Sequence, residues 1–409
     1  MDQRNTLQQD HRTGVAPRPA GPRTVMLTSG RLPVSLELAR IAREAGCRVV
    51  VAECFDTHLC KYSSAVDKTY QTAAPARDPD GFRRDLLEIA RKEKVDLVLP
   101  ACEEVLYVAG FADEFPPGCE VYCDKAERMI RMHDKYEFIR YVEELGFPVP
   151  QTESFTDRLP EFCATTDFVV KPHFSRSGRN VNICKAGTPL RTLNTRIGEK
   201  YLAQRKIEGR IYCTFAAVLK GKLSFHITYE PSMTNGSYGI CFRSLNHARI
   251  ESWVREFAEK TNWHGFLSFD FIEQEDGQFF PIECNPRPTS GIHMITASML
   301  RGVLGHPDES PEPDGRTKAA PKFTMVGIGM VKILPEVLFL RPWRIFVFIL
   351  NALRSRDVIF SLKDPLPALH QLVLFYYYFV KTRQESITMT EVPTYMLEWP
   401  PDSRAGEPG

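Results

Sequence analysis

The sequence predicts an α/β domain with a parallel sheet, followed by an α+β domain that ends in a β-hairpin. The chain opens with a buried-strand run at 23–30, a helix pattern at 33–45 and a second strand-like run at 47–54. This β-α-β order indicates parallel strands. A Gly-Phe-Pro-Val-Pro break at 146–150 closes the first domain, and strand-like runs dominate from there to 287. An apolar segment after 322 is expected to add a helical or mixed cap.

Composition sets wide limits on the function. The 409 residues are enough for two or three domains, and 43% hydrophobic with 25% charged residues is ordinary for a folded chain. A formal net charge of +1 gives no reason to expect a nucleic-acid partner. Eleven cysteines without a Cys-x-x-Cys pair are typical of reduced thiols, so we expect a cytoplasmic protein. Residues 1–22 have no apolar core and are interpreted as a disordered tail, not a secretory signal.

The first domain continues with alternating helices and strands. The loop at 29–33 is not Gly-x-Gly-x-x-Gly, so an NAD-type site is not expected. Glu103 and Glu104 directly follow a strand, at the edge where open α/β sheets bind ligands. They could orient a substrate amine or simply cap the next helix. The further elements expected here are a helix at 81–94, strands at 95–102 and 120–123, and a helix at about 125–145.

A candidate phosphate-binding loop opens the second domain. Residues 167–184 read strand, loop, strand, with Lys171 ending the first strand and small residues Ser175, Ser177 and Gly178 in the loop. Such residues let backbone N–H groups approach phosphate oxygens, and the lysine adds a point charge. The alternative is an ordinary hairpin turn. The remaining elements expected are strands at 201–209, 211–221 and 222–230, and a helix at 247–260.

The hairpin at 265–287 places two acids opposite each other. Asp276-Gly277 is a two-residue turn signal, and counting outward from it pairs Asp270 with Glu283. Asn285 lies on the same face as Glu283. Facing like charges destabilise a hairpin unless a cation lies between them, and oxygen ligands suit Mg²⁺. The alternative is a solvated surface hairpin with an incidental acid pair.

Residues 24 to about 300 resemble the ATP-grasp superfamily in the order of four motifs. These are an Asp-Lys pair ahead of the 146–150 break, a Val-Val-Lys-Pro strand with its Ser/Gly loop, a Gln-to-Gly hinge at 204–209, and Asp270 separated from Glu-Cys-Asn-Pro-Arg at 283–287. The last motif is the most specific of the four. The resemblance implies a preATP-grasp domain followed by an ATP-grasp fold of two α+β lobes.

The resemblance also implies a role for each matching residue. Lys135 and Lys171 would hold nucleotide phosphates, and the loop with Ser175, Ser177 and Gly178 would close over them. Arg287 would steady an acyl-phosphate and the oxyanion formed on its attack, with Lys171 also counted as catalytic. The hinge that would bind the base comprises Gln204, Lys206 and Ile207, with Glu208 as a candidate ribose contact. The metal ligands would be Asp270, Glu283 and Asn285.

The activity implied is an ADP-forming carboxylate–amine ligase that uses ATP with Mg²⁺ or Mn²⁺. It would activate a small carboxylate as an acyl-phosphate and join it to an amine. A kinase-like phosphotransferase and a non-catalytic nucleotide-binding module are the alternatives. Two departures weaken finer assignments: Ile211 stands where many members have a ribose-binding glutamate, and Ser268 stands where D-alanine-type ligases have an arginine. Arg243 and His293 are substrate-contact candidates, with a surface salt bridge and a satisfied histidine as the alternatives.

The predicted organisation has five parts. They are a tail at 1–22, a preATP-grasp domain at 23–124, an ATP-grasp domain at 125–303, a Pro- and Gly-rich loop at 304–321 and an accessory segment at 322–409. The accessory segment is apolar and aromatic with cationic flanks, but its last two apolar runs are too short to span a bilayer. It could pack as a cap on the grasp domain, mediate homodimerisation, or lie on a membrane surface.

Overall fold

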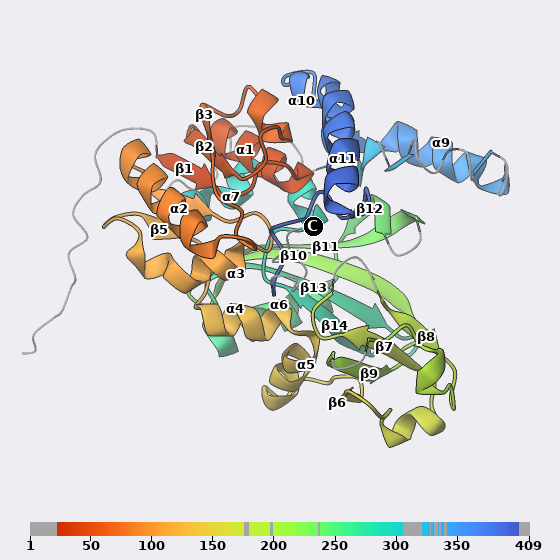
Figure 1. Cartoon of the computed structure of the whole chain (residues 1–409). Coiled ribbons are helices and arrows are strands. Elements are labelled where there is room, and N and C mark those ends of the chain that lie inside the picture. Colours follow the sequence, from red (N-terminus) through yellow and green to blue (C-terminus); the bar gives the residue numbers. More distant parts are fainter. Residues whose placement is uncertain are drawn as a thin grey trace, which may run out of the picture.

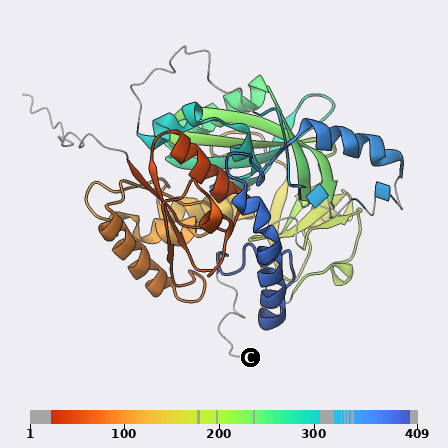
Figure 2. The same cartoon turned by 90° about the horizontal axis from the view of Figure 1, so that it is seen from above.

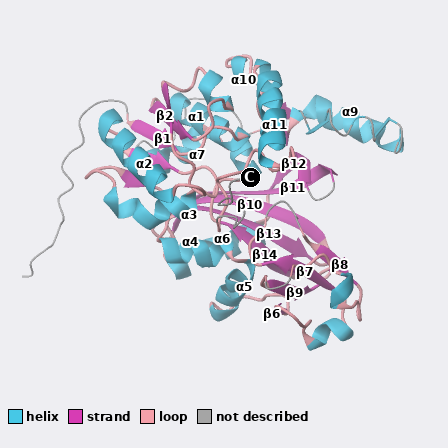
Figure 3. Cartoon of the chain, viewed as in Figure 1, coloured by secondary structure: helices cyan, strands magenta, loops and turns pink. Residues whose placement is uncertain are grey.

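The computed structural model is built around three sheets, with helices packed on and between them (Figure 1). Figure 3 shows that helices dominate the N-terminal third, whereas strands dominate the middle of the chain. The residues that the structure describes are 23–175, 180–196, 199–235, 238–305, 321–327, 329–330, 334, 337–338 and 342–400.

The first sheet is parallel throughout, as predicted, in the order β3-β2-β1-β4-β5. The half-exposed edge strand β3 was not predicted, because its sequence Lys-Thr-Tyr-Gln has no apolar run. Its strands are β1 (Thr24–Leu27), β2 (Arg48–Glu53), β3 (Lys68–Gln71), β4 (Leu97–Leu99) and β5 (Glu120–Val121). Its helices are α1 (Pro33–Glu44), η1 (Leu59–Tyr62), α2 (Pro79–Glu93), α3 (Val105–Val108) and η2 (Ala109–Glu114).

The helix predicted at 125–145 is two helices, α4 (Ala126–His133) and α5 (Lys135–Glu144). Asp134 separates them, with an extended backbone and a side chain that accepts hydrogen bonds from the N–H groups of Tyr136 and Glu137. An aspartate in that conformation starts a new helix. The prediction of one helix was therefore wrong, and the new start places Lys135 in the first turn of α5.

A small antiparallel sheet follows, in the order β6-β9-β7-β8. The predicted strand-loop-strand at 167–184 is its β7-β8 pair, while β6 was not predicted. Its elements are β6 (Thr152–Phe155), η3 (Glu161–Ala164), β7 (Phe168–Pro172), β8 (Asn182–Cys184), η4 (Leu190–Thr192) and β9 (Tyr201–Arg205).

The large sheet has seven strands in the order β14-β13-β10-β11-β12-β15-β16. One face packs on α6 through an aromatic cluster that includes Trp253, Phe257 and Phe269. The other face shares a core with η5, with α7 and with α1, a helix that packs on the first sheet. The elements are β10 (Arg210–Leu219), β11 (Lys222–Asn235), β12 (Tyr238–Leu245), α6 (Ala248–Thr261), β13 (Gly265–Glu273), β14 (Phe279–Asn285), η5 (Ser290–Met294) and α7 (Ala297–Leu304).

The C-terminal segment extends this sheet and covers part of the first domain. β15 (Phe323–Met325) pairs with β12, and β16 (Arg356–Asp357) pairs with β15. α9 (Ile345–Arg354) projects from the body, whereas α11 (Gln371–Glu385) lies beside the N-terminal domain (Figures 1 and 2). Asp364 fixes this arrangement by accepting hydrogen bonds from Ser63, Ser64 and Arg40. The short elements η7 (Pro342–Arg344) and α10 (Leu366–Leu369) complete the segment.

No helix in the described part of the chain has both the length and the hydropathy that crossing a bilayer requires.

Candidate active site

The hairpin of β13 and β14 places Asp270 opposite Glu283, as predicted. The predicted two-residue turn was wrong, because the Gln274 N–H donates to the Gln278 carbonyl and leaves a three-residue loop. That loop shifts the pairing by one residue, and a bulge between Asp270 and Phe271 shifts it back. The acid pair therefore depends on the bulge as well as on the turn.

Burial and, after it, the facing Glu283 carboxylate raise the pKa of Asp270 from its usual value near 4, and the net value is about 6. Lys171 and Lys135 act against this rise but do not cancel it. The two acids are therefore held together at an electrostatic cost in the absence of a cation.

Asn285 and Arg287 continue the same face of β14. The Asn285 amide donates to Glu283 Oε1 at 3.1 Å, and Asn285 Oδ1 accepts from Arg287 Nη2 at 3.1 Å. The three predicted residues thus form one chain of hydrogen bonds, in which Asn285 joins the carboxylate to the guanidinium.

Lys135 reaches this site because α5 and β7 are fastened together. The Asp134 carboxylate, which caps α5, also accepts from His173 Nδ1 at 3.0 Å. The Lys135 N–H donates to the His173 carbonyl at 3.0 Å. The Lys135 ammonium then lies 3.8 Å from Glu283 Oε2 and donates to the Ser175 carbonyl at 2.7 Å. The fastening was not predicted, although the sequence Asp-Lys at 134–135 carried a capping signal.

Lys171 lies one residue before the end of β7 and also reaches this site. Its buried ammonium donates to Gln204 Oε1 at 3.0 Å. Burial lowers the pKa of Lys171 to about 8, the nearby Lys135 acts in the same direction, and Glu283 and Asp270 oppose it. Two ammonium groups and two carboxylates therefore share one region.

The hinge predicted at 204–209 connects β9 to β10. Gln204 is buried and donates to Thr152 Oγ1 at 3.0 Å, so its side chain is held within the small sheet. Lys206 pairs with Glu208, and Ile207 between them is half-buried. A Cβ at Gly209 would lie 2.1 Å from the Glu273 carbonyl oxygen, so glycine is required where the chain crosses β13.

Ser177 and Gly178 of the predicted phosphate loop lie outside the described residues. Ser175, at the edge of that loop, presents its carbonyl to Lys135. This contact joins the described edge of the loop to the site.

The two glutamates after β4 have different positions. Glu104 is fully buried and accepts from Thr28 Oγ1 and from the N–H groups of Ala101 and Cys102, so it stabilises its own loop. Glu103 instead faces the site. Its Oε1 lies 3.7 Å from Arg287 Nη2 and its Oε2 lies 3.5 Å from His133 Nε2.

The two substrate-contact candidates lie in other ion pairs. Arg243 pairs with Glu230, which Arg210 also contacts. His293 is buried, with its Nδ1 3.7 Å from Glu37 Oε2. No contact of either residue with the acid pair occurs among the described residues.

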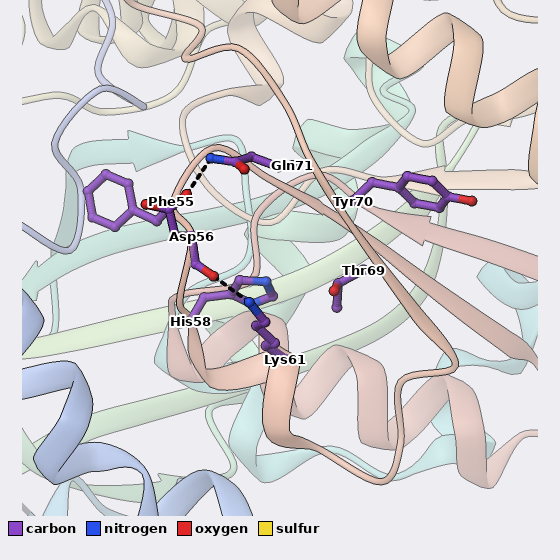
Figure 4. Close-up of a pocket in the computed structure, with 7 residues that line it drawn as sticks. All are labelled: Phe55, Asp56, His58, Lys61, Thr69, Tyr70 and Gln71. Carbon is purple, nitrogen blue, oxygen red and sulfur yellow. Dashed lines mark hydrogen bonds between the residues drawn. The ribbon is translucent and has the colours of Figure 1, made fainter.

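A separate pocket lies beyond β2, with a volume of about 270 Å³ (Figure 4). Its polar groups contact one another: Lys61 Nζ donates to the Asp56 carbonyl at 2.7 Å, and Gln71 donates to the Asp56 carboxylate at 2.5 Å. It contains none of the predicted site residues. The residues that line it are Phe55, Asp56, His58, Lys61, Thr69, Tyr70 and Gln71.

The donor set of the hairpin fits a divalent cation that shares its ligands with a substrate. Asp270 and Glu283 supply carboxylate oxygens, and the raised pKa of Asp270 reflects a position that a cation would relieve. No group of three or more His, Cys, Asp or Glu side chains in the described residues could hold a metal alone. Mg²⁺ commonly binds through one or two carboxylates plus phosphate oxygens, which agrees with this set.

A model of the ATP-grasp domain family matches residues 132–291. This range contains the predicted site residues from Lys135 to Arg287 but not Glu103. This chain contains an ATP-grasp domain. The match begins just before the Asp134 cap and ends within η5. The resemblance drawn from the four motifs is therefore confirmed.

Solved structures with this fold align over most of the chain. One is the biotin carboxylase domain of Hydrogenobacter thermophilus 2-oxoglutarate carboxylase in complex with MgADP and bicarbonate. It has a TM-score of 0.55 and 16% sequence identity, and the alignment covers 69% of this chain and 70% of that domain. Staphylococcus aureus N5-carboxyaminoimidazole synthetase with ADP has a TM-score of 0.56 and 14% sequence identity. The alignment covers 70% of this chain and 78% of the synthetase. Bacillus licheniformis L-amino acid ligase has a TM-score of 0.53 and 14% sequence identity. The alignment covers 70% of this chain and 75% of the ligase. No curated protein sequence matches the chain.

The cost of the acid pair leads to a prediction about stability. Because folding raises the Asp270 pKa, this carboxyl contributes stability at low pH that is lost as the pH rises from about 4 to 6. In EDTA at pH 7, the Asp270→Asn variant should therefore be more stable than wild type, by on the order of 1–2 kcal/mol. Mg²⁺ with ATP should stabilise wild type but not the variant.

Thermal unfolding with EDTA or with MgATP measures both effects. The control is Glu275→Gln, in the exposed loop of the same hairpin, which should change neither value. A lower unfolding temperature for Asp270→Asn in EDTA would contradict the proposed repulsion.

Proposed function

We propose that this protein is an ADP-forming ligase that activates a carboxylate as an acyl-phosphate and joins it to an amine. The observation that carries the proposal is the position of Lys135 and Lys171 beside the facing acids Asp270 and Glu283, with Arg287 joined to Glu283 through Asn285. Three cations beside a divalent-metal site suit a triphosphate and the phosphoryl group that leaves it.

Phosphoryl transfer needs positioning and charge neutralisation more than a protein nucleophile. Lys135 and Lys171 would bind phosphate oxygens. Lys171, with a pKa of about 8, is mostly protonated at neutral pH, and a bound phosphate would favour its charged form further. Asp270, Glu283 and Asn285 would hold Mg²⁺ or Mn²⁺, which when bound neutralises phosphate charge.

Arg287 would stabilise the negative charge that develops on the acyl group. It is placed for this by Asn285 on one side and Glu103 on the other. An arginine keeps its charge throughout, so it can bind the acyl-phosphate and the tetrahedral oxyanion in turn.

The classes of substrate come from the comparisons. The aligned structures include an N5-carboxyaminoimidazole synthetase and an L-amino acid ligase. Their names support a small carboxylate and an amine as substrates here, with the amine drawn from amino acids or similar molecules. The same proposal includes domain boundaries after residues 124, 303 and 321 and a cytoplasmic location. It also includes a homodimer, because the Hydrogenobacter structure is described as a domain dimer.

A screen of ADP and phosphate release against carboxylates and amines tests this function. Addition of hydroxylamine should trap a hydroxamate, because it attacks an acyl-phosphate and leaves a stable product. Arg287→Ala should lower the rate of hydroxamate formation by about 100-fold, the usual loss when a charge-stabilising group is removed. ADP formation with a stable phosphorylated product and no hydroxamate would instead identify a phosphotransferase. Tight ATP binding without substrate-dependent ADP release would identify a binding module.

Glu103 leads to a separate prediction. Glu103→Gln removes the charge that faces Arg287 while keeping the side-chain size, so the guanidinium should be less well held. We expect kcat to fall by roughly 10-fold with little change in the KM for ATP, because a positioning residue acts on the reacting geometry. Glu114→Gln, on the exposed surface of the same domain, is the control. A rise in the KM for ATP with unchanged kcat would place Glu103 in nucleotide binding instead.

A further inference from the structure

The C-terminal segment carries most of the exposed large hydrophobic side chains in the described part of the chain. Of the 17 large hydrophobic side chains exposed in the described residues, 15 lie between Leu338 and Met389. Exposed apolar side chains that occur singly need no explanation, but a concentration of this kind marks an interaction surface.

α9 packs on the large sheet through Phe348 and Ala352, yet much of its apolar surface remains exposed. Asn351 is its one buried residue, and the Asn351 amide oxygen accepts a hydrogen bond from Ser232 of β11 at 2.8 Å. Phe346, Ile349 and Leu353 follow one another at helical spacing and are all exposed, Leu353 to 81%. An amphipathic surface helix normally turns such a stripe toward the core, so this second apolar stripe of α9 is left uncovered by the described part of the chain.

α11 shows a second stripe of this kind. Leu374 and Tyr378 are buried against the body of the protein, whereas Leu372, Tyr376 and Phe379 are exposed at helical spacing. The connection between the two helices adds further exposed apolar side chains, at Phe360, Leu362, Leu366 and Leu369.

The three acids between Leu338 and Met389 all have partners within the chain. Asp357 accepts from the Gly327 N–H, Asp364 binds Arg40, and Glu385 binds Arg77. Among the cations, Arg356 binds Glu37. In contrast, several cations have no acidic partner within the described part of the chain. These are Arg344, Arg354, Lys363 and Arg383.

We propose that α9, α11 and the connection between them form a surface that binds an anionic membrane. Apolar stripes combined with unpaired cations match an interface of acyl chains and negative headgroups. Trp343, exposed to 74% just before α9, suits the headgroup level of such an interface. At 10 and 15 residues, α9 and α11 are too short to cross a bilayer and would lie on it.

A second copy of the chain fits this surface less well. In a twofold dimer the same patch meets itself, so the unpaired cations of one copy would lie against those of the other. The acids that could compensate them already bind partners inside the chain. Charge complementarity therefore favours a negative lipid surface.

Vesicle flotation with the full chain tests the proposal. We expect binding to equimolar phosphatidylcholine–phosphatidylglycerol vesicles that is at least about tenfold stronger than binding to phosphatidylcholine alone, and weaker at raised salt. The emission of Trp343 should shift to the blue on binding, and Trp343→Phe should remove that shift without preventing flotation.

Two variants identify the surface. Phe346→Ser combined with Leu353→Ser should weaken vesicle binding by at least about tenfold, because it removes apolar area from the membrane contact. Ile183→Ser, which changes a side chain exposed to 71% on β8, is the matched control and should bind as wild type. Arg354→Glu should weaken binding to anionic vesicles alone, and it keeps the test decisive if the double variant is unstable.

Three results would overturn the proposal. One is a wild-type chain that floats with neither kind of vesicle. Another is unchanged binding by both the double variant and Arg354→Glu. The third is a stable dimer in sedimentation velocity that the double variant dissociates, since a second copy would then cover this surface. None of these outcomes depends on the proposed ligase activity, which ADP release measures separately.

Discussion

Two carboxylates facing each other across β13 and β14 are the constraint on which the rest of the site depends. Burial of Asp270 and, after it, repulsion by Glu283 raise the pKa of Asp270, so without a cation this carboxyl tends to bind a proton. The surrounding chain supplies positive charge from Lys135 of α5 and Lys171 of β7, and Arg287, two residues beyond β14, is joined to Glu283 through Asn285. The two lysines lower the pKa of Asp270 only in part, and a divalent ion would relieve the remaining cost.

The cations are positioned by contacts between elements that are distant in sequence. Asp134 caps α5 and also binds His173, which lies two residues beyond Lys171. One aspartate therefore sets the position of both lysines. The first domain contributes Glu103 from the end of β4, the edge at which open parallel sheets bind ligands, so the site includes groups from both domains.

The sequence was informative where function requires a local pattern. The motif from Glu283 to Arg287, the lysine in an apolar strand and the hinge glycine each predicted part of the candidate site, because each is carried by neighbouring residues. The pairing of Asp270 with Glu283 was predicted from the wrong turn, because the register shifts of the three-residue loop and of the bulge cancel each other.

The split between α4 and α5 was missed because amphipathic spacing continues across Asp134. The contact of Glu103 with Arg287 joins residues 184 positions apart, and no local pattern carries such information. The outward apolar face of α9 could not be predicted because periodicity locates a stripe without showing what it faces.

Proton exchange on nucleotide binding tests the account most directly. With a pKa of about 6, Asp270 is about half protonated at pH 6 in the free protein. With a pKa of about 8, Lys171 is about half protonated at pH 8. Calorimetry of MgADP binding in buffers of different ionisation enthalpy should therefore detect release of about half a proton at pH 6, as the metal displaces the proton of Asp270. At pH 8 it should detect uptake of about half a proton, as phosphate restores the charge of Lys171. Binding without proton exchange at either pH would show that neither group meets the metal–nucleotide complex, and would contradict the account.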